Sequence, residues 1–421
     1  MKKTIINHGA NLVILPTTQF KTLHIAVDFS TAVEPENISA RALVSYLTAV
    51  SSARYKTQQQ VAQKTIDLYG AQYQTDVFRI GQTHHVRFTL QIPAPTNIVG
   101  GKQLLTEAFD FLREMIFNPL TENHAFNEQV FANEQQSLIN ELASVKDDKS
   151  RYAVAKLREI TYDKSGMRVS ASGNEETVAH LNPSGVYQAY QNMINDDAMN
   201  IVVLGDINQQ QIISLLEKWP IVPHQAKEEK EPFYRQASRL HLSELVEHKT
   251  SINQAMLTMA YQLNVKPFDD QRFAVMVMNS LLGGTPLSKL FMNVREKESL
   301  AYSIYSRWQH DTGFLTIAAG LDTTKVRQTD TMIQEQIKAV QEGDFDNQTV
   351  DAIKMSLISD YLSQRDSPAS QMEVAFSRLL TRRETSEQEW IDRVKSVTAD
   401  DIQNAAQKIS LQSRYILLPE V

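Results

Sequence analysis

Histidine and carboxylate side chains are the groups that could hold a metal in this sequence, because it contains no cysteine. The 421 residues include 10 His and no Cys, which excludes disulfides, thiolate zinc sites and a cysteine nucleophile. The only clustered histidines, His84 and His85, lie in the segment GQTHHVRFTL. This segment alternates like a strand, so adjacent side chains point to opposite faces and are not expected to share a metal. The other histidines are isolated and are interpreted as surface or satisfied core residues.

Three common enzyme signatures are missing from the sequence. It has no Gly-x-Ser-x-Gly elbow, no Gly-x-x-x-x-Gly-Lys-Ser/Thr loop and no Gly-x-Gly-x-x-Gly fingerprint, which are the marks of serine hydrolases, P-loop proteins and dinucleotide-binding domains. The pair Gly283-Gly284 is interpreted as a turn between a helix and a loop.

The first half of the chain has the pattern of a sheet covered by helices. The period-two stretches LVILP, LHIAVDF and VRFTLQIP predict half-buried strands. Between them, Ser39–Val50 and Thr57–Tyr69 repeat apolar residues at helical spacing, and Gly70 stands where a helix C-cap is expected,. Two long helical stretches follow, separated near Asn118-Pro119, and the apolar run NIVVLGDI predicts a closing buried strand,.

The same order of elements recurs in the second half. NQAMLTMAYQL takes the place of the early strand, FAVMVMNSLLGGTPLSKLF that of the helix after it, and GFLTIAAGL that of the returning strand,. A long helical pair and the closing strand SRYILLPEV complete the repeat. We predict an α+β fold of two homologous repeats, each an antiparallel-rich sheet covered by helices. The alternative is one large irregular α+β domain.

The segment between the two halves has the composition of a linker. KWPIVPHQAKEEKEPFYRQASR carries charge and proline without periodicity, which is typical of an exposed connection. We predict an N-terminal repeat over residues 1–219, a linker over 220–235 and a C-terminal repeat over 236–421.

Composition and charge disfavour two classes of partner. Hydrophobic residues make up 42% and charged residues 22% of the chain, as in ordinary globular proteins. A net charge of -7 provides no general attraction for nucleic acid or an anionic membrane. The sequence contains no uncharged apolar stretch of ~18 residues, so no transmembrane helix is predicted. Its N-terminal residues lack the continuous apolar core of a signal peptide. We therefore expect a cytoplasmic protein.

Four segments resemble the zinc peptidase family that includes pitrilysin, insulin-degrading enzyme and the mitochondrial processing peptidase. Residues 42–46 fall where the family has a helix bearing His-x-x-Glu-His, and ANEQQSLINE matches its Glu-Arg-x-x-x-x-x-Glu helix. Residues 155–207 follow the family's stretch that ends in the "VVGDI" strand. LLGGTPLSKLFMNVREKESLAYSIYS closely resembles GGGxSSRLFxxVREKxGLAYxV. On these motifs the chain is identified as a member of this pitrilysin/insulinase/processing-peptidase family.

The resemblance implies that the zinc site is degenerate. Residue by residue, the two histidine positions of the motif correspond to Ala42 and Tyr46, its glutamate to Ser45, and the third metal ligand to Glu141. A zinc peptidase needs neutral imidazoles and a carboxylate around the metal, with one position open for water. Alanine offers no ligand, and the protonated hydroxyls of Ser and Tyr are poor substitutes for imidazole at neutral pH. We expect no metal and no other cofactor.

The resemblance also implies a role for Arg295 and Tyr302 in VREKESLAY. In the family, this arginine and tyrosine reach across an enclosed chamber, bind the substrate backbone and support the tetrahedral intermediate. A guanidinium fork and a phenol donor suit peptide carbonyls and a developing oxyanion. The alternative is that Arg295 forms a surface ion pair with Glu296 and that Tyr302 packs in a core.

The leading hypothesis is a non-catalytic subunit of a heterodimeric zinc peptidase that acts on a peptide substrate. A homologous partner would supply the zinc site, and this chain would supply Arg295 and Tyr302; self-association is a further possibility for the pairing. The second hypothesis is a pseudoenzyme that holds a partner or peptide without chemistry, and the third is a hydrolase with an unrecognised site. The resemblance to bacterial members without the zinc motif also links the chain with the modification of translation elongation factor P.

Overall fold

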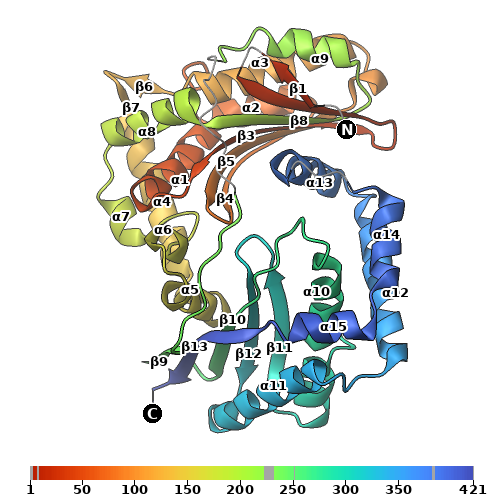
Figure 1. Ribbon diagram of the computed structural model, residues 1–421. Coiled ribbons are helices and arrows are strands. Elements are labelled where there is room, and N and C mark those ends of the chain that lie inside the picture. Colours follow the sequence, from red (N-terminus) through yellow and green to blue (C-terminus); the bar gives the residue numbers. More distant parts are fainter. Residues whose placement is uncertain (1–2, 7–8, 222–231, 251, 382–384, 421) are drawn as a thin grey trace. The chain divides into compact units, whose positions relative to one another are not determined.

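A computed structural model describes residues 3–6, 9–221, 232–250, 252–381 and 385–420 of the chain. The chain forms two compact units, which are shown in Figure 1. Unit 1 consists of residues 1–143, 170–232 and 365–382, and unit 2 consists of residues 144–169, 233–364 and 383–421. Most of the predicted linker, residues 220–235, lies outside the described residues.

Unit 1 is built on a six-stranded sheet in the order β1-β2-β8-β3-β5-β4. The strands are β1 (Lys3–Ile6), β2 (Ala10–Pro16), β3 (Thr22–Ala32), β4 (Gln72–Ile80), β5 (Thr83–Pro93) and β8 (Ala198–Gly205). All neighbours pair antiparallel except β2 and β8, which are parallel. The pairing leaves β4 as an outer strand, and successive side chains of each strand point to opposite faces of the sheet.

The helices of unit 1 cover both faces of this sheet. They are α1 (Pro35–Val50), α2 (Gln58–Asp67), α3 (Gly101–Phe117), α4 (Glu128–Ser144), α7 (Glu175–Ala179), α8 (Pro183–Asp196), α9 (Gln209–Leu216) and α13 (Pro368–Thr381), with a short turn η1 (Pro95–Asn97) and a small hairpin β6 (Thr121–Glu122) and β7 (Ala125–Phe126). The larger core lies on the face covered by α1, α3 and α8, where Val27 and Phe88 are fully buried. On the opposite face, Ala26 and Val202 pack against Phe376 of α13.

Unit 2 is built on a five-stranded sheet in the order β11-β12-β10-β13-β9. The strands are β9 (Ser243–Lys249), β10 (Ala255–Gln262), β11 (Ala301–Gln309), β12 (Phe314–Leu321) and β13 (Ser410–Pro419). Here β9 and β13 are parallel, and the other neighbours are antiparallel. Strand β11 is therefore an outer strand, as β4 is in unit 1.

The helices of unit 2 likewise lie on two faces. They are α5 (Lys149–Thr161), α6 (Ser165–Arg168), α10 (Arg272–Asn279), α11 (Val326–Gln341), α12 (Asn347–Gln364), α14 (Glu387–Ser396) and α15 (Ala399–Ala406), with a short turn η4 (Thr323–Lys325). Two π-helical segments, η2 (Ser280–Gly284) and η3 (Leu290–Lys297), follow α10. The larger core includes α10, α11 and α15 on one face. On the other face, Ala153 and Leu157 of α5 pack with Met256 of β10 and Tyr415 of β13.

The two sheets repeat one topology, which confirms the predicted α+β fold of two repeats. Read from the outer strand inward, the order β4-β5-β3-β8-β2 in unit 1 corresponds to β11-β12-β10-β13-β9 in unit 2. In both sheets the closing strand runs parallel to the first strand of the repeat and antiparallel to the second. The segments NQAMLTMAYQL, GFLTIAAGL and SRYILLPEV thus take the strand positions that the pattern predicted. The turn expected at Gly283-Gly284 is the end of the π-helical segment η2.

Unit 1 takes α13 from the second half of the chain, and unit 2 takes α5 and the short α6 from the first half. Helix α13 follows α12 in sequence but clusters with unit 1, and α5 follows α4 but clusters with unit 2. Both helices cover the face opposite to the larger core of the sheet on which they pack. The exchange gives each sheet a second covered face, which one repeat does not supply for itself.

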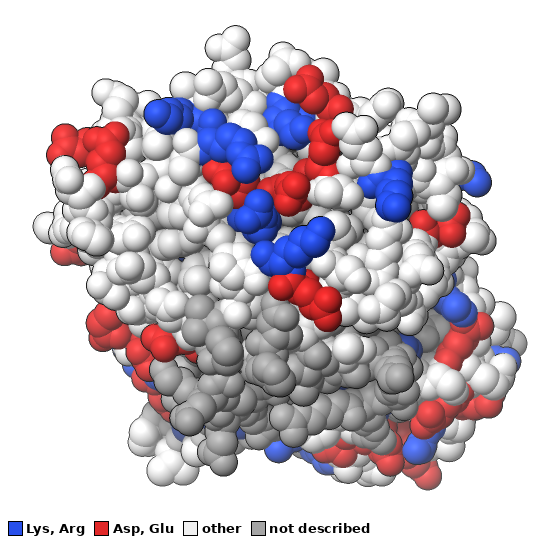
Figure 2. Space-filling model, turned by 90° about the horizontal axis from the view of Figure 1, so that it is seen from above, with Lys and Arg blue, Asp and Glu red and all other residues white. Residues whose placement is uncertain are grey.

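The surface in Figure 2 carries basic and acidic side chains side by side, with no continuous patch of one sign on the face in view. This mixture fits the moderate net charge of -7. Among the described residues, no helix combines the length and the apolar character needed to cross a membrane.

Candidate functional site

Helix α1 carries three of the positions at which the zinc motif would lie. Ala42, Ser45 and Tyr46 are spaced i, i+3 and i+4, so they share one side of the helix. Ala42 is 0% and Ser45 is 3% exposed. The main-chain carbonyl of Ser45 accepts a hydrogen bond from Thr75 Oγ1 of β4 at 2.8 Å, which holds the helix against the outer strand. A buried methyl group and a buried hydroxyl therefore stand where ligand and base are expected.

The fourth position, Glu141, lies on α4 and meets α1. The phenol of Tyr46 donates a hydrogen bond to Glu141 Oε2, so the structure brings these two predicted positions together. Burial, then the hydrogen bond to Glu141 and its negative charge, raise the pKa of Tyr46 above its ordinary value. The phenol therefore stays protonated at neutral pH and acts as a donor to the carboxylate rather than as an anionic metal ligand.

Two further carboxylates contribute to this site and were not found by sequence reasoning. The charges of Glu134 on α4 and Asp76 on β4 also raise the pKa of Tyr46, and burial raises the pKa of Glu134 itself. Glu134 is the third residue of the segment ANEQQSLINE and precedes Glu141 by seven residues, about two helical turns,. That spacing was the available signal in the sequence. Among the described residues, no group of three or more His, Asp or Glu side chains is arranged to hold a metal ion.

The adjacent histidines of β5 have separate buried partners. His84 Nδ1 accepts a hydrogen bond from Arg41 Nε at 3.0 Å, and its Nε2 donates to the Ala171 carbonyl at 2.8 Å. His85 Nδ1 lies 2.9 Å from Asp28 Oδ1. Burial, aided by the charge of Arg41, lowers the pKa of His84 to about 3. Both rings are thus core histidines that point to different neighbours, as expected for consecutive residues of a strand.

Arg295 and Tyr302 lie on adjacent elements of unit 2. Arg295 belongs to η3, where its Nε is 3.7 Å from Glu296 Oε1 and its guanidinium carbon is 4.6 Å from the centre of the Phe291 ring. π-Helical turns are rare and often occur at functional sites. The Arg295 side chain is 40% exposed, so the ion pair with Glu296 is a surface interaction that is weak in water and leaves the guanidinium accessible.

Tyr302 is 59% exposed on the outer strand β11, and so it does not pack in a core. The pairing of β11 with β12 is irregular between Ala301 and Ser303, because these residues oppose Leu321 and Gly320. Tyr302 is the extra residue of this β-bulge, and bulges turn a side chain away from its regular direction. Among the described residues, no hydrogen bond joins Tyr302 to Arg295.

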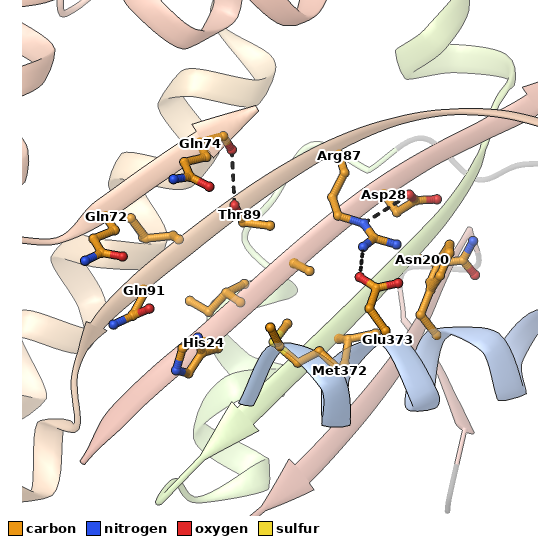
Figure 3. A pocket seen from close by; sticks show the side chains of 16 residues that line it. His24, Asp28, Gln72, Gln74, Arg87, Thr89, Gln91, Asn200, Met372 and Glu373 are labelled. Carbon is orange, nitrogen blue, oxygen red and sulfur yellow. Dashed lines mark hydrogen bonds and ion pairs between the residues drawn. The ribbon is translucent and has the colours of Figure 1, made fainter. Parts of the chain in front are cut away.

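A second candidate site lies in unit 1, where α13 crosses the sheet (Figure 3). Arg87 of β5 bonds Asp28 of β3, at 3.4 Å from Nε to Oδ2, and forms an ion pair with Glu373 of α13. The side chains of this network line a pocket between the helix and the sheet. Sequence reasoning missed the pocket. The signal was a charged residue at an inward position in each of the predicted strands LHIAVDF and VRFTLQIP.

Comparisons with known proteins agree with these features. Residues 180–357 match the family model described as "Peptidase M16 inactive domain". The chain is 27% identical to the probable inactive metalloprotease YmfF of Bacillus subtilis over 97% of this chain and 96% of that protein. It is 24% identical to the uncharacterized zinc protease YmxG of the same organism over 74% of each. A crystal structure of a conserved protein from Enterococcus faecalis superposes with a TM-score of 0.95 and 29% identity, covering 99% of both chains.

Two sheets of repeated topology, together with this family match, define a peptidase-like protein. The chain is therefore similar to the pitrilysin/insulinase/processing-peptidase family, the M16 peptidases, by a family match over residues 180–357 and by relatives along almost its whole length. Both the matched family model and the Bacillus relative YmfF are described as inactive.

Proposed function

We propose that this chain is the non-catalytic subunit of a heterodimeric zinc peptidase. A homologous partner would bind the zinc, and this chain would present Arg295 and Tyr302 to the peptide being cleaved. The observation that carries the proposal is the contrast between two sets of residues. Ala42 and Ser45 are buried and Tyr46 is bonded to Glu141, whereas Tyr302 is exposed on an outer strand.

The chemistry of the exposed pair needs a second component. A guanidinium and a phenol stabilise negative charge on a carbonyl oxygen, but neither group generates the nucleophile that attacks the carbonyl. A zinc-bound water supplies that nucleophile in metallopeptidases. The motif positions of this chain lack imidazole ligands, so another polypeptide would bind the zinc and its water.

In this proposal, strand edges hold the peptide. Strands β4 and β11 are the outer strands of their sheets, and an extended peptide can add to such an edge through main-chain hydrogen bonds. Tyr46 and Glu141 lie beside β4, and Tyr302 lies on β11 itself. Each edge would therefore present a bound peptide to one of the two sets of residues.

The test is copurification followed by reconstitution. The tagged chain is isolated from its native cells, and copurifying proteins are searched for one with a His-x-x-Glu-His motif. Cleavage of an unstructured peptide mixture is then measured for each chain alone and for the pair. We expect cleavage by the pair and no cleavage by this chain alone. Cleavage by the partner alone at the rate of the pair would contradict the proposal.

The second candidate is a peptide-binding scaffold without a role in catalysis. It is favoured by the acidic partners of Tyr46 and Arg295 within the chain. Both side chains thus have interactions that do not require a metal or a substrate. Strand addition at β4 or β11 would be sufficient for this function. A chain that binds peptides with unchanged affinity, and leaves the cleavage rate of every copurifying partner unchanged, would support the scaffold.

A further inference from the structure

The pocket under α13 has no part in the function proposed above. It has a volume of about 230 Å³ and is formed entirely by unit 1, from β3, β4, β5, β8 and α13. Figure 3 shows its two ends, with Arg87, Asp28 and Glu373 at one end and a group of glutamines at the other. The two ends differ in charge, and this difference indicates the kind of ligand that fits.

Strand register places the glutamines side by side. Gln91 of β5 pairs with His24 of β3 and with Gln72 of β4. Two residues along, Thr89 pairs with Ala26 and with Gln74. Paired residues, and residues two apart on a strand, lie on the same face of a sheet. The two rows therefore form one continuous polar surface.

The floor of the pocket is small and apolar. Ala26 projects only a methyl group from the centre of the surface, and Val202 of β8 and Met372 of α13 lie beside it. A larger side chain at position 26 would occupy the space that the pocket leaves open. The pocket therefore has room for a short apolar group of a ligand, surrounded by polar groups.

The charged groups of the pocket are paired with one another, and the one donor of this group that is left without a hydrogen bond among the described residues, Arg87 Nη2, can donate to a neutral carbonyl oxygen,. Asp28 is bonded to His85 at 2.9 Å and to Arg87 at 3.4 Å, and Arg87 is also paired with Glu373. Phe376 stacks below the guanidinium, with its ring centre 4.4 Å from the guanidinium carbon. A charged ligand would have to displace one of these partners, at the cost of leaving a buried ion without its counter-charge.

The neutral groups, by contrast, are available. Among the described residues, none forms a hydrogen bond with the side-chain amides of Gln72, Gln74 or Gln91, and the amide nitrogen of the buried Asn200 also lacks a partner. His24 is bonded through Nε2 to Thr22 Oγ1 at 2.8 Å, and burial lowers its pKa, which keeps the ring neutral at pH 7. Amide groups both donate and accept hydrogen bonds.

We propose that this pocket is a binding site for a small, neutral ligand that carries an amide group. Amides of the ligand and of the glutamines can form paired hydrogen bonds, because each offers one donor edge and one acceptor edge. The volume lies below the ~300–1,000 Å³ of pockets for drug-sized ligands. The ligand is therefore about as large as one amino-acid residue, either a free small amide or the Gln or Asn side chain of a peptide.

Binding of capped amino acids to the full chain tests this assignment. The probe is N-acetyl-glutaminamide, titrated in ligand-observed NMR, with N-acetyl-lysinamide and the corresponding glutamate derivative as charged competitors. We expect a dissociation constant on the order of 1 mM for the glutamine probe, as is usual for a ligand of this size. The charged probes should bind at least ~10-fold more weakly, because one lost polar match is worth about that factor.

Three variants connect the binding to the pocket. Gln74→Leu and Gln91→Leu each remove one amide, and Ala26→Leu fills the floor; each should weaken binding at least ~10-fold. Gln74 is exposed, so its replacement does not threaten folding. Gln210→Leu, on the exposed side of α9, is the matched control and should bind like the unmodified chain.

A pentapeptide distinguishes the two possible sources of the amide group, a peptide side chain and a free small amide. If the capped peptide Ala-Ala-Gln-Ala-Ala binds ~10-fold more tightly than the single residue, the natural ligand is a peptide side chain. If it binds more weakly, the ligand is a free small amide. Absence of saturable binding of the glutamine probe, tighter binding of a charged probe, or equal binding by all three pocket variants would each overturn the assignment.

Discussion

The phenol of Tyr46 donates a hydrogen bond to the carboxylate of Glu141, and the sequence resemblance predicts that these two residues correspond to two zinc ligands of the family motif. A metal in an active member would connect the corresponding helices through coordination bonds. In this chain, a hydrogen bond between α1 and α4 makes that connection without a metal. The contact therefore links the two helices through side chains of the protein itself.

The first prediction concerns metal content. Protein purified in the presence of zinc should contain no stoichiometric zinc after dialysis, because Ala42, Ser45 and Tyr46 replace both imidazoles and the base. Elemental analysis measures the zinc-to-protein ratio directly. One tightly held zinc per chain that is lost on the change Glu141→Gln would show that Glu141 still belongs to a metal site.

The second prediction concerns the hydrogen bond itself. Tyr46→Phe removes the phenol donor and should lower the free energy of unfolding by about 1 kcal/mol at pH 7. The folded-state pKa of Tyr46 is raised, so the stabilisation is present below the ordinary tyrosine pKa and is lost as the pH rises through the folded value. Urea denaturation at pH 7 and pH 10.5 tests both points. Tyr69→Phe, at a tyrosine that is 58% exposed, is the control and should change neither value.

The third prediction concerns a buried ion pair behind the sheet of unit 1. Arg41 Nη1 and Asp197 Oδ2 are 2.6 Å apart. Burial outweighs the attraction of Arg41 and raises the pKa of Asp197 from 3.8 to about 6. A raised pKa means that the stabilisation is complete below pH 3.8 and is lost as the pH rises towards 6. The stability of the unmodified chain relative to Asp197→Asn should therefore fall by up to about 3 kcal/mol between pH 4 and pH 6.5.

The measured quantity is the free energy of unfolding of the unmodified chain minus that of Asp197→Asn. Both proteins share all other titrating groups, so the contributions of those groups cancel. Urea denaturation of the two proteins at four pH values measures this difference. A difference that is constant over this range would mean that Asp197 titrates with its ordinary pKa in the folded protein.

The fourth prediction concerns the exchanged helix α13. Phe376 is 3% exposed, packs edge-to-face with the rings of Phe78 and His85, and lies against the guanidinium of Arg87. Phe376→Ala should lower the free energy of unfolding by about 3–5 kcal/mol, as for other buried phenylalanines. Val374→Ala, on the same helix at a residue that is 39% exposed, should cost little.

Hydrogen exchange locates the effect of Phe376→Ala. Because α13 packs on unit 1, amides of β5 and β8 should lose protection, while those of β10 and β12 should not. The opposite distribution would show that α13 belongs with unit 2, the unit that contains most of its own half of the chain.

The regular elements were predictable from the sequence because local periodicity determines them. The period-two stretches LVILP, LHIAVDF and VRFTLQIP became β2, β3 and β5, and the apolar run NIVVLGDI became β8. The recurring order of elements identified β10, β12 and β13 in the second half. The π-helical segments η2 and η3 were not predictable, because their sequence, SLLGG and LFMNVREK, has ordinary helical composition. Segment η2 packs closely against β11, because a Cβ added at Gly283 would lie only 2.7 Å from the main-chain nitrogen of Ser306, and this tertiary contact is not visible in the local sequence.

The exchange of helices and the pocket of unit 1 were beyond sequence reasoning for a different reason. Arg87 and Glu373 are 286 residues apart, and no local pattern indicates which sheet an amphipathic helix covers. A pairing rule for the strands would have placed Arg87 opposite Asp28, since both lie at inward positions of neighbouring strands. The position of α13, which completes the pocket, depends on tertiary packing alone.

The last prediction is that Arg295 and Tyr302 affect cleavage only when a zinc-bearing partner is present. Facing a partner's zinc, the guanidinium and the phenol would stabilise the tetrahedral oxyanion, and loss of such a donor typically lowers the rate ~10²–10³-fold. Tyr302→Phe removes one hydroxyl and keeps the ring, and because Tyr302 is exposed the change should not affect folding. Arg295→Lys keeps the charge but loses the fork-shaped pair of donors.

Tyr305→Phe, on the same strand at a tyrosine that is 42% exposed, is the matched control. Peptide cleavage by the reconstituted pair is the measurement, with partner affinity determined for every variant so that lost assembly is distinguished from lost chemistry. If the Tyr302 and Arg295 variants both cleave at the unmodified rate, the shared active site is ruled out and the scaffold function takes its place.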